Sequence, residues 1–273
     1  MLKLRYKSVT TVPVEVEAIT PDNLADKTPK EIAQISIQHG TEVAPLGDFY
    51  VVEGDASDRE IEIEGDCSRV KWIGAGMKSG RIVVRGNVGM HLGSEMTGGE
   101  IEVHGCAGDW VGAEMRGGHI HVYGDAGHLI GSAYRGAHVG MRGGEILIDG
   151  KAGNEIGGHL RRGLIAVAGD AGDFIGVGMI AGSIVIGGEP GQRIGAGMKR
   201  GTIVMLTKEP RMLPTFRYDC DYRPSFLSIY LSQLRAWGFP MPGNLPSKWR
   251  RFSGDLVELG LGEIFTPLAE SDR

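Results

Sequence analysis

The sequence has little of what several classes of protein require. Its three cysteines, Cys67, Cys106 and Cys220, are odd in number and far apart. They match neither a disulfide framework nor a zinc site, which favours a reducing cytoplasm. There is no run of about 18 apolar residues, and the N-terminal MLKLRYKSVT lacks the apolar region of a signal peptide. A formal net charge of −5 gives no reason to expect a nucleic-acid partner. We therefore expect a soluble, cytoplasmic protein with no membrane or nucleic-acid contact.

Familiar catalytic motifs are also missing. The chain has no nucleophile elbow, HExxH helix, Walker A loop or paired CxxC. Short GxG stretches, such as residues 195–197, resemble phosphate loops, but a phosphate loop occurs once, between a strand and a helix. Here the stretch recurs without a following helix, so a turn explains it better. We expect no catalytic residue in this chain.

Glycine, by contrast, is abundant and periodic. It accounts for 45 of 273 residues, whereas roughly 7% is the average content. Isoleucines recur at steps of 19, 19, 26, 19, 19 and 19 residues: Ile82, Ile101, Ile120, Ile146, Ile165, Ile184 and Ile203. A glycine stands two positions before each of them, and all but the last are followed by glycines four, seven and eleven positions later. Self-similarity at a fixed short period is typical of a solenoid.

The repeat predicts an all-β fold. Each unit reads Gly-x-Ile-x-Val-x-Gly, and this alternation of apolar residues is typical of a strand. One strand per 19-residue coil, with glycines where the backbone turns through positive φ, describes a single-stranded β-helix. About seven to eight coils, stacked about 4.8 Å apart, would give a rod on the order of 35 Å long. Alternation alone does not determine the handedness of the coil.

The repeat also divides the chain into three predicted parts. Residues 1–58 contain strand-like alternation and a helix start at Thr28-Pro29, and they would cap the open end of the coils. Residues 59–206 are the glycine-repeat coils. Residues 207–273 lose the period; apolar residues at helical spacing predict a helix at about 225–237, followed by an extended tail.

The outward strand positions change character along the repeat. In successive coils they read Val83, Glu102, His121, Leu147, Ala166, Val185 and Val204. The first half of this face is polar and the second half is apolar. Exposed apolar ladders on flat strands invite association, so we expect the C-terminal helix or another subunit to cover the later coils.

One candidate site is a patch of outward histidines and glutamates: Glu100, Glu102, His104, His119, His121 and Glu145. Histidine with carboxylate can bind metals, but a solvated polar face explains the same residues, and no tight metal motif is present. We therefore predict no metal site.

A second candidate is a basic column four residues before each isoleucine: Lys78, Thr97, Arg116, Arg142, Arg161, Ile180 and Lys199. Stacked cations repel each other unless an anion lies beside them. The five basic members are therefore a candidate surface for an acidic cofactor tail or an acidic partner. Alternatively, these charges are simply solvated, with Glu95 and Glu114 near enough to pair with them.

The long step between Ile120 and Ile146 places seven extra residues near 134–141, with Arg135 and His138 among them. Insertions in repeat arrays map to loops on one face and often form the contact surface. We expect a partner to contact this loop.

The coil motif, Gly-x-Ile-x-Val-x-Gly-x-x-Gly-x-x-Ile-Gly-x-x-Met, resembles the glycine-rich (GXGXG) β-helix domain at the C-terminal end of glutamate synthase large subunits. It is still more similar to the C subunit of formylmethanofuran dehydrogenase and of its bacterial counterpart, the formyltransferase/hydrolase complex of methylotrophs. The motif alone indicates only the superfamily. The resemblance extends over the cap, the coils and the segment around 223–240, which favours the C subunit.

This resemblance implies a right-handed β-helix that serves as a non-catalytic scaffold. In the bacterial complex, hydrolase and formyltransferase subunits exchange a formyl group on a methanofuran-type carrier with a glutamate-rich tail. The pathway takes tetrahydromethanopterin-bound one-carbon units to formate, as in the formaldehyde oxidation of methylotrophy. Partners would be the hydrolase, formyltransferase and dehydrogenase-B-like subunits, and any metals would lie in those subunits. The basic column is then a candidate surface for the acidic tail of the carrier.

Three alternatives stay open. The chain is also compatible with the C subunit of a tungsten or molybdenum formylmethanofuran dehydrogenase, whose other subunits carry the metal pterin and iron–sulfur clusters. A stand-alone scaffold of a glutamate synthase would copurify with amidotransferase and flavin-binding subunits. A β-helix carbohydrate-active enzyme would need clustered acids and a calcium site, and neither is visible in the sequence.

Overall fold

Strands dominate the computed structural model, which describes residues 1–268. In this part of the chain, 13 strands form one large sheet in the order β15-β16-β17-β14-β13-β12-β11-β10-β9-β8-β6-β1-β5. The prediction of an all-β protein is confirmed. Residues 269–273, the end of the predicted segment 207–273, lie outside the described part of the chain.

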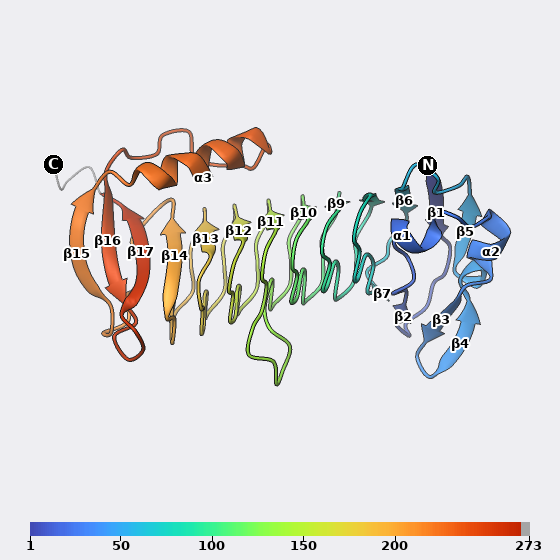
Figure 1. The fold of residues 1–273 in the computed structure, drawn as a ribbon, viewed down its shortest axis with the longest axis horizontal. Helices are drawn as coiled ribbons and strands as arrows, with labels where there is room; N and C mark the ends of the chain where they lie inside the picture. The colour runs from blue at the N-terminus through green and yellow to red at the C-terminus, as the bar shows by residue number, and fades with distance from the viewer. Residues whose placement is uncertain (269–273) are drawn as a thin grey trace.

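The middle of the large sheet has one short strand per sequence repeat, and these strands are parallel (Figure 1). They are β6 (Glu60–Glu64), β8 (Arg81–Arg85), β9 (Glu100–Val103), β10 (His119–Val122), β11 (Glu145–Ile148), β12 (Leu164–Val167), β13 (Ser183–Ile186) and β14 (Arg200–Met205). Ile120 lies opposite Ile101 on one side and opposite Ile146 on the other. The 26-residue step therefore keeps the register, and its extra residues leave the stack as a loop.

The inward side chains of these strands form a continuous apolar core. Each of the seven repeat isoleucines is 0% exposed. A second line of parallel single-residue bridges joins the coils at Cys67, Val88, Ala107, Ala126, Ala152, Ala171 and Pro190. Burial of one such isoleucine contributes roughly 1.5–3 kcal/mol, so the stacked files of side chains hold the coils together.

Two glycine positions show why the columns of glycine are needed. Gly112 has φ +60°, and a Cβ at this position would clash with Cδ1 of Ile146. Gly86 lies against the carbonyl oxygen of Gly65, where a Cβ would also clash. Close packing of neighbouring coils therefore requires a residue without a side chain at these turns.

The N-terminal segment extends the large sheet and builds a second, smaller sheet. β1 (Leu2–Tyr6) pairs in parallel with β6 and antiparallel with β5 (Tyr50–Glu53), which ends the large sheet. The small sheet has the order β4-β3-β2-β7. Its strands are β4 (Glu42–Pro45), β3 (Ser36–His39), β2 (Val14–Glu15) and β7 (Val70–Lys71).

Short helices complete this N-terminal segment. They are α1 (Pro21–Leu24), α2 (Pro29–Ala33) and the 3₁₀ turn η1 (Leu46–Asp48). Thr28 caps α2 through a reciprocal capping box with Glu31, at the helix start that Thr28-Pro29 predicts.

The C-terminal segment contains more strand than the sequence indicates. After β14 come β15 (Arg217–Tyr222), the helix α3 (Ser225–Ala236), β16 (Trp249–Gly254) and β17 (Leu261–Pro267). β17 pairs in parallel with β14, and β16 and β15 follow in antiparallel order. Within the segment predicted as an extended tail, residues 249–254 and 261–267 are strands that continue the large sheet.

α3 lies along the later coils, over the apolar half of the outward face (Figure 1). Its side chains Leu227, Leu231 and Leu234 form one buried cluster with outward residues such as Ala166 and Val185. The predicted C-terminal helix therefore covers the apolar outward face of the later coils, as the sequence indicates. None of the helices within residues 1–268 has the length and apolar character needed to cross a membrane.

Candidate functional site: a basic groove

The predicted basic column lies along one exposed edge of the coils. The amide of Arg116 donates to the carbonyl of Met96 (2.8 Å), and the amide of Lys199 donates to that of Met179 (2.7 Å). Every column position after Lys78, including Thr97 and Ile180, is held one coil from the position before it by a backbone hydrogen bond of this kind. The side chains of Lys78, Arg116, Arg142, Arg161 and Lys199 are all exposed.

No acidic side chain neutralises this column within residues 1–268. None of its five basic side chains forms an ion pair or hydrogen bond there. Of the two glutamates proposed as partners, Glu114 instead accepts a hydrogen bond from the amide of Tyr134 (3.1 Å). The arrangement therefore presents a row of unpaired positive charge.

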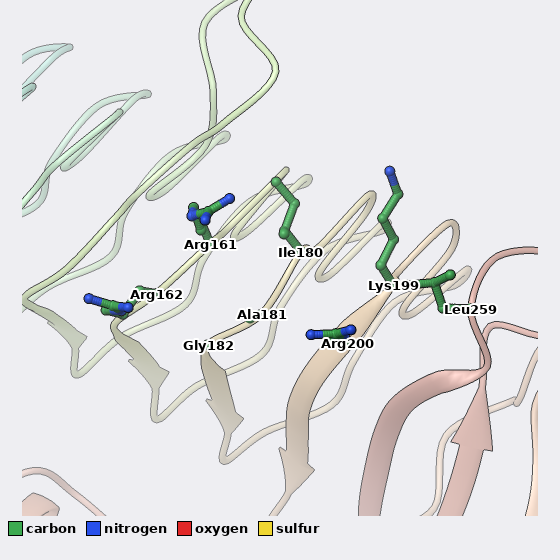
Figure 2. A pocket seen from close by; sticks show the side chains of 8 residues that line it. All are labelled: Arg161, Arg162, Ile180, Ala181, Gly182, Lys199, Arg200 and Leu259. Atoms are coloured by element: carbon green, nitrogen blue, oxygen red, sulfur yellow. The ribbon is translucent and has the colours of Figure 1, made fainter.

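At the C-terminal end of the column, the surface forms a groove of about 500 Å³ (Figure 2). Its lining is Arg161, Arg162, Ile180, Ala181, Gly182, Lys199, Arg200 and Leu259. Four of these residues are cationic and none is acidic. Two members of the predicted column, Arg161 and Lys199, therefore belong to a built concave site.

The sequence of three successive coils explains the hollow. Two coils carry adjacent basic residues, Arg161-Arg162 and Lys199-Arg200, whereas the coil between them carries residues 180–182, Ile-Ala-Gly. Figure 2 shows the long basic side chains on both sides of this coil, whose residues 180–182 have shorter, uncharged side chains or none. The flanking coils are two strand spacings apart, or about 10 Å, which leaves a basic channel with a partly apolar floor.

The charge of the groove limits what it binds. Four cations in a small region raise the local positive potential, and only an anion with several charged groups relieves their mutual repulsion. Arginine binds carboxylates through two parallel hydrogen bonds, which favours a carboxylate ligand at Arg162 and Arg200. The groove is therefore suited to binding an acidic chain and contains no nucleophile or general base.

No family model matches the sequence. Over 95 residues the chain is 44% identical to the C subunit of the tungsten-containing formylmethanofuran dehydrogenase 2 of Methanothermobacter wolfeii, over 33% of this chain and 35% of that protein. It is 45% identical over 88 residues to the C subunit of the molybdenum-containing formylmethanofuran dehydrogenase 1 of Methanothermobacter thermautotrophicus, over 32% of this chain and 22% of that protein. The match spans about a third or less of the length of these curated relatives.

A solved structure matches over the full length. A chain in the crystal structure of the formyltransferase/hydrolase complex FhcABCD from Methylorubrum extorquens, in complex with methylofuran, has a TM-score of 0.91 and 36% identity. The match covers 98% of this chain and 100% of that chain. The chain belongs to the family of formylmethanofuran dehydrogenase C subunits. The family resemblance drawn from the repeat motif is confirmed.

In this member of the family, the other three predicted basic residues lie outside the groove. The carboxylate of Asp22 accepts a hydrogen bond from the amide of Lys78 (2.8 Å), near the N-terminal cap. Arg116 and Arg142 lie one coil apart in the middle of the column, since the amide of Arg142 donates to the carbonyl of Met115 (2.6 Å).

Sequence reasoning missed two groove residues, Arg162 and Arg200. They stand three residues before the repeat isoleucines, one position after the predicted column. Only these two coils have a basic residue at that position, since the others have serine, glycine or alanine. A search for unusually large residues in an otherwise small-residue column would have found them.

The outward histidines and glutamates of the earlier coils pair with neighbouring side chains. Nε2 of His121 lies 2.9 Å from Oδ1 of Asp149, and Arg81 donates to Glu102 (2.6 Å). Burial raises the pKa of Glu102, but the hydrogen bond and charge of Arg81 outweigh this effect and bring the pKa below its usual value. Within residues 1–268, no three His, Cys, Asp or Glu side chains converge as a metal site.

The inserted loop is fastened to the coils by Tyr134. The Tyr134 hydroxyl donates to Oγ of Ser94 (2.9 Å) and lies 2.9 Å from Nδ1 of His91. Its ring stacks on Trp110, with 4.9 Å between the ring centroids, and burial raises the pKa of Tyr134 to about 12. Arg135 stays exposed just beyond this anchor, so the loop presents a charged tip on a fixed base.

Proposed function

We propose that this chain is the scaffold subunit of a formyltransferase/hydrolase complex. In that complex, other subunits transfer a formyl group between tetrahydromethanopterin and a methanofuran-type carrier and hydrolyse the carrier-bound formyl group to formate. The observation that carries the proposal is the likeness to a chain of FhcABCD, at 36% identity over 100% of that chain. The partners are then the hydrolase, formyltransferase and dehydrogenase-B-like subunits, in the cytoplasm.

In this proposal the chain contributes no catalytic step. The coil interior is filled with apolar side chains, and on the earlier strands charged outward residues are paired, Arg81 with Glu102 and His121 with Asp149. Any metal, and the reacting end of the methanofuran-type carrier, belong to other subunits. The role of the chain is to hold those subunits at fixed positions along its length.

The finer description of the fold is part of the same proposal. The coils form a right-handed, single-stranded β-helix of about seven to eight coils at residues 59–206. Residues 1–58 are its cap, and residues 207–273 are its C-terminal extension. Parallel strands in matched register and the second line of bridges support this description.

We further propose that Lys78, Arg116, Arg142, Arg161 and Lys199 contact an acidic cofactor tail or an acidic partner surface. Their exposure and the lack of acidic partners within residues 1–268 support this role. Charge reversal at Arg116, Arg142 and Arg161 should weaken assembly or activity, more strongly at low salt. A control with the same change in net charge reverses three exposed residues outside the column, Lys30, Arg217 and Lys248.

The direct test is purification of the tagged chain with its native partners. Hydrolase and formyltransferase subunits should copurify, and the preparation should release formate from a formylated methanofuran analogue. Copurification with amidotransferase and flavin-binding subunits would instead identify a glutamate synthase scaffold.

The second candidate is the C subunit of a tungsten or molybdenum formylmethanofuran dehydrogenase. It is favoured by the 44–45% identity to curated subunits of those enzymes. Elemental analysis of the purified complex separates the two candidates, because only the dehydrogenase should contain stoichiometric tungsten or molybdenum.

A further inference from the structure

A loop beside the basic groove exposes an unusual number of aliphatic side chains. It connects β16 to β17, and the exposed fractions are 50% for Leu256, 76% for Val257 and 56% for Leu259, with 59% for Leu261, the first residue of β17. Single exposed aliphatic residues are common, but four within six positions form a patch of the kind that marks interaction sites. Leu259 itself lines the groove next to Lys199 (Figure 2).

The loop is held rigidly in place by Asp255. This carboxylate is 5% exposed and accepts hydrogen bonds from the amides of Gly197 (2.9 Å) and Val257 (3.1 Å). The amide of Gly260 closes the loop by donating to the Asp255 carbonyl (2.9 Å). Gly197 belongs to the coil that carries Lys199, so the aliphatic side chains have a fixed position relative to the cations. Binding to a loop that is already ordered costs less entropy.

The titration of Asp255 agrees with this anchoring role. Burial raises the pKa of its carboxyl, but the hydrogen bonds that it accepts, among them those from the amides of Gly197 and Val257, outweigh burial, so the pKa lies below its usual value. The carboxylate therefore stays charged and keeps its hydrogen bonds at neutral pH.

The groove thus combines two kinds of surface. Arg161, Arg162, Lys199 and Arg200 provide positive charge at its sides, while Ile180 and Leu259 provide apolar contact. Alternate residues of an extended peptide lie roughly 7 Å apart, so two carboxylates on one side of a peptide reach the flexible cations of both flanking coils. A chain of carboxylates alone would leave the aliphatic loop uncovered.

We propose that the groove docks an extended, acidic segment of a partner protein, with an aliphatic side chain of that segment packed against Val257 and Leu259. The proposal deepens the function proposed above and rests on it, since the partner is another subunit of the same complex. Two acidic ligands were considered for Arg161 and Lys199, a cofactor tail and a partner surface. The aliphatic loop beside the groove favours the partner surface.

Two peptides of equal charge test the docking on the purified full-length chain. The first is Glu-Leu-Glu-Gly-Glu-Leu-Glu-Gly, and the second has serine in place of both leucines. By fluorescence anisotropy, the leucine peptide should bind about tenfold or more tightly than the serine peptide. The double variant Val257→Ser/Leu259→Ser should lose this preference and keep its affinity for the serine peptide. The double variant Arg162→Glu/Arg200→Glu should lose its affinity for the leucine peptide and for the serine peptide.

Matched controls lie outside the groove. Val43→Ser changes an aliphatic residue that is 63% exposed, and Lys30→Glu reverses an exposed basic residue outside the basic column; neither should alter the leucine preference. Equal affinity for the two peptides, or no binding of either, would overturn the proposal.

Assembly of the complex distinguishes failure of this proposal from failure of the proposed function. With the Val257→Ser/Leu259→Ser chain, recovery of partner subunits should fall at least about fivefold relative to the wild-type chain, since loss of aliphatic burial lowers affinity. Recovery equal to wild type would overturn the docking while leaving the scaffold function intact. If even the wild-type chain recovers no hydrolase or formyltransferase, the proposed function fails. The peptide measurements still decide whether the groove binds an acidic segment with an aliphatic side chain.

Discussion

Two halves of one sheet face, built from the same repeat, have opposite surroundings. Along β6 to β10 the outward side chains are mostly charged or polar and form pairs, such as His121 with Asp149. Along β11 to β14 they are apolar and buried beneath α3, as Val185 is at 1% exposure. The inward residues hardly differ between the halves. The repeat therefore specifies the core everywhere, while the outward positions specify which part of the face the chain itself covers.

The boundary between the halves is sharp. α3 ends at its C-cap Trp237, whose ring lies 5.1 Å from the ring of His119 in β10. Gly238 follows with φ +74°, a conformation that favours glycine and turns the chain away. The cover thus ends where the outward residues become polar.

The largest expected effect comes from removing apolar contact under the helix. Leu234 is 0% exposed, and Leu234→Ala should lower the free energy of unfolding by about 2–5 kcal/mol through lost burial and a new cavity. Ile229 lies on the same helix but is 71% exposed, so Ile229→Ala should change it by less than about 0.5 kcal/mol. Urea denaturation measures the free energy of unfolding of both variants. Similar losses would contradict the packing of the Leu234 side of α3 against the sheet.

A second comparison changes the same repeat position on the two halves. Val185→Thr buries a hydroxyl beneath α3 and should cost about 1–3 kcal/mol. Val83→Thr makes the same change on the uncovered half and should cost less than about 0.5 kcal/mol. Thermal and urea unfolding of the two variants test this contrast, which fails if Val83→Thr is as damaging as Val185→Thr.

A third change probes the boundary. Trp237→Leu keeps an apolar side chain but removes the ring contact with His119, so we expect a loss of about 0.5–1.5 kcal/mol. His119→Leu, made separately and in combination, completes a double-mutant cycle. A coupling energy near zero would show that the two rings do not hold the end of the helix.

The smallest effect is expected on the polar half. Glu102→Gln removes the ion pair with Arg81 and should cost about 0.2–1 kcal/mol at pH 7. Because the folded pKa of Glu102 is below its usual 4.5, the carboxylate stabilises the protein above pH 4.5. This contribution is lost as the pH falls through the lower folded pKa. The difference between wild type and variant should therefore shrink in urea titrations from pH 6 to pH 3; a constant difference would contradict the ion-pair explanation.

Local patterns were predictable where the physics is local. Alternation around Ile101 and Ile120 predicts the strands, and helical spacing predicts α3 at Ser225–Ala236 almost to its ends. The strands at Trp249–Gly254 and Leu261–Pro267 were not predicted, because only pairing with β14 makes these residues a sheet.

The candidate site was predictable only in part. Arg161 and Lys199 belong to a regular column, so the sequence indicates them. Arg162 and Arg200 become part of a groove only because the coil between them carries small residues. Leu259 reaches that groove from a distant part of the chain.

The sequence by itself determined the all-β character, the inward files of isoleucine and the polar and apolar halves of the outer face. The first two features repeat in every coil, the third follows from comparing the same position in successive coils, and all three are visible in short stretches of sequence. The tertiary structure alone decided that β17 joins β14, that the loop at Val257 and Leu259 lies beside the cations, and that the inserted loop docks through Tyr134. Each of these contacts joins segments that no period connects, so side-chain packing between distant segments selects it.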